Sequence, residues 1–248
     1  MVTQADENES SSWFEHEIKF FQAFKEAGFE AETCYDIGSS HSGWALQLAE
    51  IFPAAKFHLF EPLLDYREPY KKSTDHILSL RPDFRIHKVA VGDRDGVTRM
   101  GLDESGYGAS TLVTKTSAGF ADLIEVPVRR LDTMVFELGL PKPEVLKIDV
   151  QGGELAVLTG AGTVLDSVQL IQAETWQTRC YGDETPLHHE ITEYLQSRGF
   201  LLAAFGDFYY GDLHELIAAD AYFVRRSLLV RCAAKLPKGS LTGIQRAP

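Results

Sequence analysis

The sequence has few cysteines, no block of basic residues and no apolar run of membrane-spanning length. Its three cysteines stand far apart, without the spacing of a zinc site or a disulfide framework, which is typical of reduced thiols in a cytoplasmic protein. The 36 acidic residues outnumber the 24 basic ones, and the net charge of -12 would repel nucleic acid. The sequence has no basic region followed by an apolar run, which is the pattern of a targeting segment. We therefore expect a cytoplasmic protein that binds neither nucleic acid nor membranes.

The composition favours one globular domain between two polar ends. Hydrophobic residues make up 44% of the 248 residues, which is ample for a buried core. We expect flexible tails over 1–12 and 236–248, and a single domain over 13–235 that begins with a helix rich in aromatic residues. That aromatic helix could serve as the face of a homodimer. A stretch rich in Gly, Ser and Thr near 96–129 is expected to be an insertion.

Segments typical of strands alternate with segments typical of helices. Residues 144–158 read Glu-Val-Leu-Lys-Ile-Asp-Val-Gln-Gly-Gly-Glu-Leu-Ala-Val-Leu, which predicts a strand, a tight turn and a helix start. Further strands are expected to end near residues 37, 61, 91, 174, 205 and 225, and helices to cover 63–80, 131–138 and 187–198. This alternation predicts an α/β fold with a mostly parallel sheet and helices on both faces.

Three of the predicted strands end on an acidic residue. These residues are Asp36, Glu61 and Asp149, and ligands of open α/β sheets bind at the carboxyl ends of the strands. Glu61 follows Gly38 by 23 positions, which suits a carboxylate that accepts hydrogen bonds from two ribose hydroxyls. Each acid alone could equally be a solvated residue or a helix cap. Together they favour a site for a nucleoside-type ligand.

The loop after the first strand distinguishes between nucleoside ligands. Gly38 is followed by Ser39, Ser40, His41 and Ser42, so the second glycine of the G-x-G-x-x-G fingerprint is missing. A nicotinamide or flavin dinucleotide needs that glycine for close backbone approach to its pyrophosphate. S-adenosylmethionine has no phosphate, and its ribose, adenine and methionine end suit an acid, serine hydroxyls and backbone N–H groups. A nicotinamide oxidoreductase is therefore the weakest of the alternatives.

These residues resemble the FkbM-type methyltransferases of the class I S-adenosylmethionine-dependent fold. The matching pieces occur in the family's order between about residues 33 and 226, and the block Leu-Lys-Ile-Asp-Val-Gln-Gly-Gly-Glu-Leu is the most specific. The pieces are 36–40, 60–62, 90–93, 109–112, 130–132, 146–160, 172–174 and 220–224. One position departs from the pattern. Ser42 stands where the family usually has a second glycine, and it could crowd the loop or donate a hydrogen bond.

The resemblance implies a Rossmann-like sheet of seven strands with an antiparallel last strand, and S-adenosylmethionine as the cofactor. The residues it places at the cofactor are Asp36, Gly38, Ser39, Ser40, Ser42, Glu61 and Pro62, with the adenine near Ala90, Val91 and Asp93. The implied activity is O-methylation of a hydroxyl on a small-molecule natural product or saccharide. The alternative is a non-catalytic protein of the same fold that binds S-adenosylmethionine. Ser42 slightly favours this alternative, whereas retention of the three strand-end acids favours the enzyme.

Two carboxylates are the candidates for chemistry at this site. Asp149 could act as the general base or orient the acceptor, because its strand end should face the sulfonium. Glu174 ends the neighbouring strand, so the two carboxylates could share one proton, which would raise an apparent pKa towards a useful range. The same pair could instead bind a divalent cation. Because no third ligand is evident, we expect no metal.

Other polar residues have more than one interpretation. Glu154 would stabilise a helix N-terminus through the helix dipole. His41, His188 and His189 remain alternative bases, because an imidazole titrates near neutral pH. The residues predicted to contact the acceptor are Trp176 and Arg179, which follow the fifth strand, and Tyr107 and Ser110, which could belong to a lid.

Overall fold

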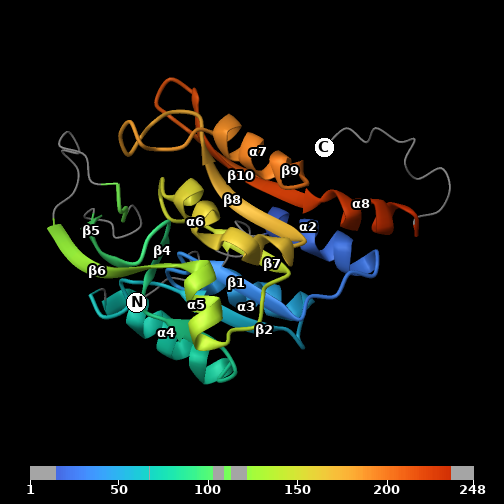
Figure 1. Cartoon of the computed structure of the whole chain (residues 1–248), viewed down its shortest axis with the longest axis horizontal. Helices are drawn as coiled ribbons and strands as arrows, with labels where there is room; N and C mark the ends of the chain where they lie inside the picture. Colours follow the sequence, from blue (N-terminus) through green and yellow to red (C-terminus); the bar gives the residue numbers. More distant parts are fainter. Residues whose placement is uncertain (1–14, 67, 103–108, 113–121, 236–248) are drawn as a thin grey trace, which may run out of the picture.

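The computed structural model describes residues 15–66, 68–102, 109–112 and 122–235. They form a seven-stranded sheet in the order β3-β2-β1-β7-β8-β10-β9 (Figure 1). Its strands are β1 (Thr33–Ile37), β2 (Lys56–Phe60), β3 (Arg85–His87), β7 (Val145–Ile148), β8 (Leu170–Trp176), β9 (Phe200–Tyr210) and β10 (Leu216–Arg225). Neighbouring strands are parallel, except that β10 is antiparallel to both β8 and β9. The predicted α/β sheet with an antiparallel last strand is confirmed.

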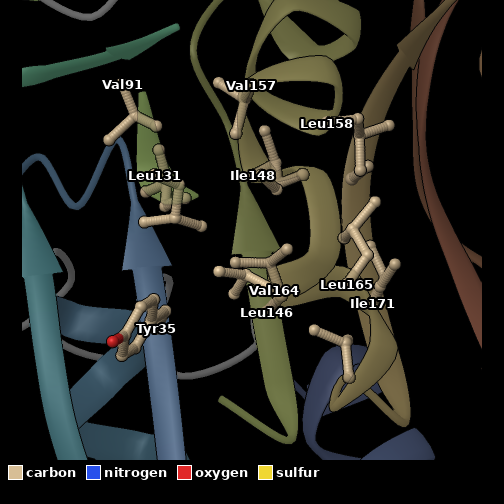
Figure 2. Close-up of a cluster of buried hydrophobic side chains, with 14 of the residues drawn as sticks. Tyr35, Val91, Leu131, Leu146, Ile148, Val157, Leu158, Val164, Leu165 and Ile171 are labelled. Atoms are coloured by element: carbon tan, nitrogen blue, oxygen red, sulfur yellow. The ribbon is translucent and has the colours of Figure 1, made fainter. Parts of the chain in front are cut away.

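Helices cover both faces of this sheet. One face carries α5 (Leu131–Leu138), α6 (Glu154–Ala161) and α7 (His188–Ser197), with the 3-10 helix η1 (Gly162–Asp166) between α6 and β8. The other face carries α2 (Glu15–Glu26), α3 (Gly43–Ile51), α4 (Glu68–Leu80) and α8 (Arg226–Ala233). Figure 2 shows the first core, where Val157 and Leu158 of α6 pack with Leu146 and Ile148 of β7. Because both faces are covered, β1 and β7 are buried along their whole length.

A second, smaller sheet corrects one prediction. Its strands are β4 (Ala90–Gly92), β5 (Gly96–Leu102) and β6 (Asp122–Arg130), in the order β4-β6-β5. The single strand predicted to end near residue 91 is two strands, because β3 ends at His87 and the chain turns before β4 enters the second sheet. The Val89 N–H donates to the His87 carbonyl at this turn, 3.0 Å away. Val89 and Val91 are both buried, so the apolar pattern runs through the turn without revealing it.

The helix predicted over 63–80 begins later, at Glu68. Residues 62–66 form turns instead. The Leu63 N–H donates to the Glu61 carboxylate, and Leu63 and Leu64 are buried against the second sheet. A side chain that captures a nearby N–H competes with helix formation, which explains the late start.

The C-terminal third contains the two predicted strands, but both are longer than predicted. β9 continues to Tyr210 and β10 begins at Leu216, so the two strands form a longer hairpin than expected. Register shifts interrupt this hairpin. They break the regular alternation of side chains between the two faces of the sheet, on which strand prediction from sequence depends. α8 was not predicted. No helix in the described ranges is long and apolar enough to cross a membrane.

Gly160 provides a test of the packing between α6 and the second sheet. A Cβ on Gly160 would lie 1.8 Å from the carbonyl oxygen of Gly92. We expect Gly160→Ala to destabilise the protein by about 1–3 kcal/mol through overpacking. In an open helix the same change would stabilise by about 0.5–1 kcal/mol, so the sign of the effect is diagnostic. Urea unfolding measures it.

Gly43→Ala is the matched control, because a Cβ on Gly43 of α3 meets nothing within 4 Å. A Gly160→Ala protein that is as stable as the Gly43→Ala protein would contradict the close contact.

Candidate active site

A cavity of about 430 Å³ opens at the carboxyl ends of β1, β2, β7 and β8. Most of the residues predicted at the cofactor line it, together with both predicted catalytic carboxylates. The predicted residues in its lining are Gly38, Ser40, Glu61, Pro62, Ala90, Val91, Asp149 and Glu174. The structure therefore brings Glu61, Asp149 and Glu174 to one place with apolar residues of the second sheet.

The remaining predicted residues lie around this cavity. Asp36, Ser39 and Ser42 are buried and are not part of the cavity lining. Asp93 lines a neighbouring cavity of about 350 Å³, which shares Val91 and Thr111 with the first. Ser110 is buried and donates to the carbonyl oxygen of Gln151.

The residues predicted to form an acceptor wall are held by other contacts. Trp176 packs edge-on against Tyr181, outside the lining. Arg179 pairs with Glu190 and donates to the carbonyl oxygens of Asp183 and Thr185, so its guanidinium organises its own loop. Tyr107 lies outside the described residues.

Gly38 allows the turn after β1 to cross the end of β7. Its φ is +79°, and a Cβ at this position would lie 1.8 Å from the carbonyl oxygen of Asp149. The Asp149 N–H donates to the Ile37 carbonyl, which fixes the two strand ends together. Ser42 also has a positive φ, +61°, and it stands at the position where the family pattern usually has a second glycine. Glycine adopts this backbone conformation more easily than serine. The Ser42 hydroxyl is also buried without a hydrogen-bond partner among the described residues.

Glu61 is held at the cavity edge by two backbone groups. The Ser40 N–H donates to its Oε2 at 2.8 Å, and the Leu63 N–H donates to its Oε1 at 2.9 Å. Burial raises the pKa of Glu61 to about 7, against the two backbone hydrogen bonds, with a smaller contribution from Asp36 and Asp149. A carboxylate has about four acceptor positions, so this one retains capacity for ligand hydroxyls.

Lys147 is a buried cation beside Asp36 and Asp149, and it was not predicted as a site residue. Its Nζ is 3.2 Å from Oδ2 of Asp149 and 3.6 Å from Oδ1 of Asp36. Burial raises the pKa of Asp36, Lys147 opposes this shift, and Asp149 adds to it. A lysine within an apolar strand segment is a sequence signal for a nearby acidic partner, because lysine is rarely buried without one.

Gln151 bridges the two predicted catalytic carboxylates and was also missed. Its Nε2 donates to Oδ1 of Asp149 and to Oε2 of Glu174, each at 2.9 Å. Its Oε1 accepts a hydrogen bond from the Tyr181 hydroxyl. Asp149 and Glu174 therefore lie on either side of one amide nitrogen, as their positions on neighbouring strands predicted.

Glu174 faces a further buried acid, Asp220 of β10, across the antiparallel pair. Burial raises the pKa of Asp220 to about 7, and burial together with Asp149 raises that of Glu174 well above its ordinary value. The Tyr209 hydroxyl donates to Oδ2 of Asp220 at 3.3 Å, and Tyr209 lines the cavity. Neither Asp220 nor Tyr209 was predicted as a site residue.

The alternative residues lie elsewhere. Glu154 accepts hydrogen bonds from the N–H groups of Val150 and Gly152, which organises the turn before α6. His41 packs against Tyr70 and His188 contacts Thr175, and neither histidine lines the cavity. In the part of the chain that the structure describes, no group of three or more His, Cys, Asp or Glu residues could hold a metal ion.

Residues 36–202 match the model of the Methyltransferase FkbM domain. A crystal structure of methyltransferase FkbM from Methylobacillus flagellatus KT is similar, with 14% identity and a TM-score of 0.50 over 78% of this chain and 43% of that one. Magnesium protoporphyrin IX methyltransferase (ChlM) from Synechocystis PCC 6803, with bound SAM, has 9% identity and a TM-score of 0.48 over 84% of this chain and 76% of that one.

This chain thus spans less than half the length of the Methylobacillus protein. No curated protein gives a significant match.

Lys147 provides a test of the electrostatics. We expect Lys147→Met to destabilise the protein by about 3–5 kcal/mol at neutral pH, because it leaves Asp36 buried without its cation. The pKa of Asp36 is already raised by burial, and losing Lys147 raises it further. A raised folded-state pKa stabilises fully below the unfolded value, and this stabilisation is lost as the pH rises through the folded value. Urea unfolding at pH 5 and pH 8 should therefore show a larger loss at pH 8.

Asp36→Asn in the Lys147→Met background is the control, because it removes the fully buried acid that Lys147 faces. It should reduce the extra loss at pH 8, and the remainder reports the other acids near Lys147, namely Glu174 and Asp220. An equal loss for Lys147→Met at both pH values would contradict the ion-pair role.

Proposed function

Because the chain belongs to the FkbM methyltransferase family, we propose that it transfers a methyl group from S-adenosylmethionine to a hydroxyl group of a small-molecule or saccharide acceptor. The observation that carries this proposal is the arrangement at the cavity. Glu61, held by two backbone N–H groups, follows β2, and the bridged carboxylates of Asp149 and Glu174 belong to the ends of β7 and β8, on the other side of β1. The side of Glu61 suits a nucleoside, and the side of the bridged carboxylates suits the reacting groups.

The residues around Glu61 fit the cofactor in chemistry and size. Glu61 can accept hydrogen bonds from the two ribose hydroxyls, and Pro62, Ala90 and Val91 offer an apolar wall for the adenine. Gly38 has no side chain, so the loop backbone can approach a ligand closely. The cavity volume of about 430 Å³ lies within the range of small-molecule sites.

The charge of the cavity also suits this cofactor. Glu61, Asp149 and Glu174 line it, and no lysine or arginine is among the described residues of its lining. When bound, S-adenosylmethionine supplies an electrophilic methyl group on a positively charged sulfonium. Buried carboxylates attract such a cation more strongly than they would in water, because the local dielectric is low.

Asp149 is the residue that we propose to take the acceptor's proton. Lys147 at Oδ2 and Gln151 at Oδ1 fix the orientation of its carboxylate. Burial and the nearby Asp149 raise the pKa of Glu174, which favours its protonated form, and a protonated Glu174 can donate a hydrogen bond to the acceptor oxygen. These residues orient the acceptor hydroxyl for an in-line displacement, in which positioning supplies much of the acceleration.

Binding of the cofactor can be tested at Glu61. We expect calorimetry to show that Glu61→Ala weakens S-adenosylmethionine binding by about 1.5–3 kcal/mol, through loss of charge-assisted hydrogen bonds. Because burial raises the pKa of Glu61 to about 7, the wild type should bind more tightly at pH 8 than at pH 6. Glu61→Gln should lose the part of this pH dependence that Glu61 contributes.

Glu68→Ala is the matched control, since Glu68 is an exposed acid on α4 that pairs only loosely with Lys72. Undetectable binding by the wild type would refute the cofactor assignment.

Catalysis can be tested at Asp149. We expect Asp149→Asn to lower methyl transfer at least about 100-fold while changing cofactor affinity much less, since general-base assistance contributes roughly 10²–10⁴-fold. Uptake of labelled methyl by a panel of hydroxylated metabolites and sugars measures turnover, and calorimetry measures affinity. Normal turnover by the variant would remove Asp149 from the mechanism. Tight cofactor binding with no transfer to any acceptor would favour the non-catalytic alternative.

A further inference from the structure

Gln151 has a backbone conformation that needs an explanation. It lies between β7 and α6 with a φ of +55°, in the left-handed region that non-glycine residues rarely adopt. Such a conformation is strained and persists only where the surroundings hold it. The Ser110 hydroxyl, which donates to the Gln151 carbonyl at 2.6 Å, is one such contact. Backbone strain of this kind often accompanies a functional role.

The side chain of Gln151 makes three hydrogen bonds around the cavity. Its amide nitrogen donates one proton to Asp149 and the other to Glu174, at 2.9 Å each. Its amide oxygen accepts from Tyr181. Gln151 itself lines the cavity, so this arrangement lies where the acceptor would bind.

Tyr181 determines which way the amide points. If the amide were reversed, its oxygen would face two carboxylates and would repel their ionised forms. With the oxygen toward the Tyr181 hydroxyl, both amide protons point at carboxylate oxygens. Burial, followed by the nearby acids, raises the pKa of Tyr181, so its hydroxyl keeps its proton and remains a donor.

We propose that Gln151 is a positioning residue that holds Asp149 and Glu174 as a coupled pair to receive the acceptor's proton, with Tyr181 fixing the amide. This role rests on the proposed function. Gln151 acts through the two carboxylates. The left-handed backbone is what places its side chain between two strand ends.

Charged groups from several elements face the pair, so the amide is only one influence on it. Lys147 of β7 attracts the carboxylates, and the surrounding acids oppose their ionisation. The groups that face the pair are Lys147, Asp36 of β1, Glu61 of β2, Glu154 of α6, Tyr181, Tyr209 of β9 and Asp220 of β10. Hydrogen bonds from an N–H favour the ionised form. Removing the amide should therefore raise the pH at which the pair ionises.

Gln151→Gly separates this role from a structural one. Glycine adopts a positive φ without strain, so the variant keeps the backbone turn, and any change in thermal unfolding reports the loss of the side-chain hydrogen bonds. We expect the pair to ionise about 1–2 pH units higher in a carbon-13 carboxyl titration, because charge-assisted hydrogen bonds are lost. The acid limb of the pH–kcat profile should move in the same direction, with kcat lowered at least about tenfold at neutral pH.

Three further variants keep the test decisive. Gln151→Asn tolerates the left-handed backbone but has a shorter amide, so its titration should also shift. Tyr181→Phe should give a smaller shift in the same direction. His214→Gly is the matched control, since His214 has a φ of +60° in the β9–β10 turn, and it should leave both titration and turnover unchanged.

The outcomes distinguish this proposal from the proposed function. If the wild type transfers no methyl group, the function fails, but the titration still shows whether Gln151 controls the pair. A Gln151→Gly protein that titrates like the wild type would overturn the role of the amide. A shifted titration with an unchanged pH–kcat profile in an active enzyme would overturn its part in the reaction.

Discussion

The candidate site depends on the close approach of two backbone turns. The loop after β1 passes so near the end of β7 that a Cβ on Gly38 would lie 1.8 Å from the Asp149 carbonyl oxygen. This contact, together with the hydrogen bond from Asp149 to Ile37, brings the cofactor loop beside the proposed base. Glu61 then reaches the loop through Ser40, and Gln151 extends the arrangement to Glu174. A side chain at position 38 would separate all of these groups.

Electrostatic cost is the second constraint on the molecule. Asp36, Glu61, Glu154, Glu174 and Asp220 are all buried acids with raised pKa values. Lys147 is buried, and its ammonium group lies within ion-pair distance of Asp36 and Asp149. A protein selected for stability alone would have little reason to bury so many carboxylates, because each must be desolvated. Their concentration around one cavity is typical of functional sites, where stability is exchanged for reactivity.

Sequence patterns predicted the features that depend on local chemistry. The alternation of apolar segments predicted the sheet and α5, and acids at strand ends predicted Asp149, Glu61 and Glu174 beside one cavity. What could not be predicted depends on the direction of side chains in three dimensions. Gln151 and Lys147 were missed because each joins Asp149 to an acid on another strand, and Tyr209 because β9 continues beyond the predicted strand end near residue 205. The break between β3 and β4 was hidden, since apolar residues continue through the turn.

The place of β1 beside β7 also bears on how the chain folds. The Thr33 N–H donates to the side chain of Glu144, 111 positions later in the sequence, and the β1–β7 pairing runs alongside. Contacts of such long range form slowly, because the loop between them must lose its conformational freedom first. The β9–β10 hairpin, by contrast, joins neighbouring segments. The cavity is lined by residues that follow both strands, so it can take shape only after β1 has paired with β7.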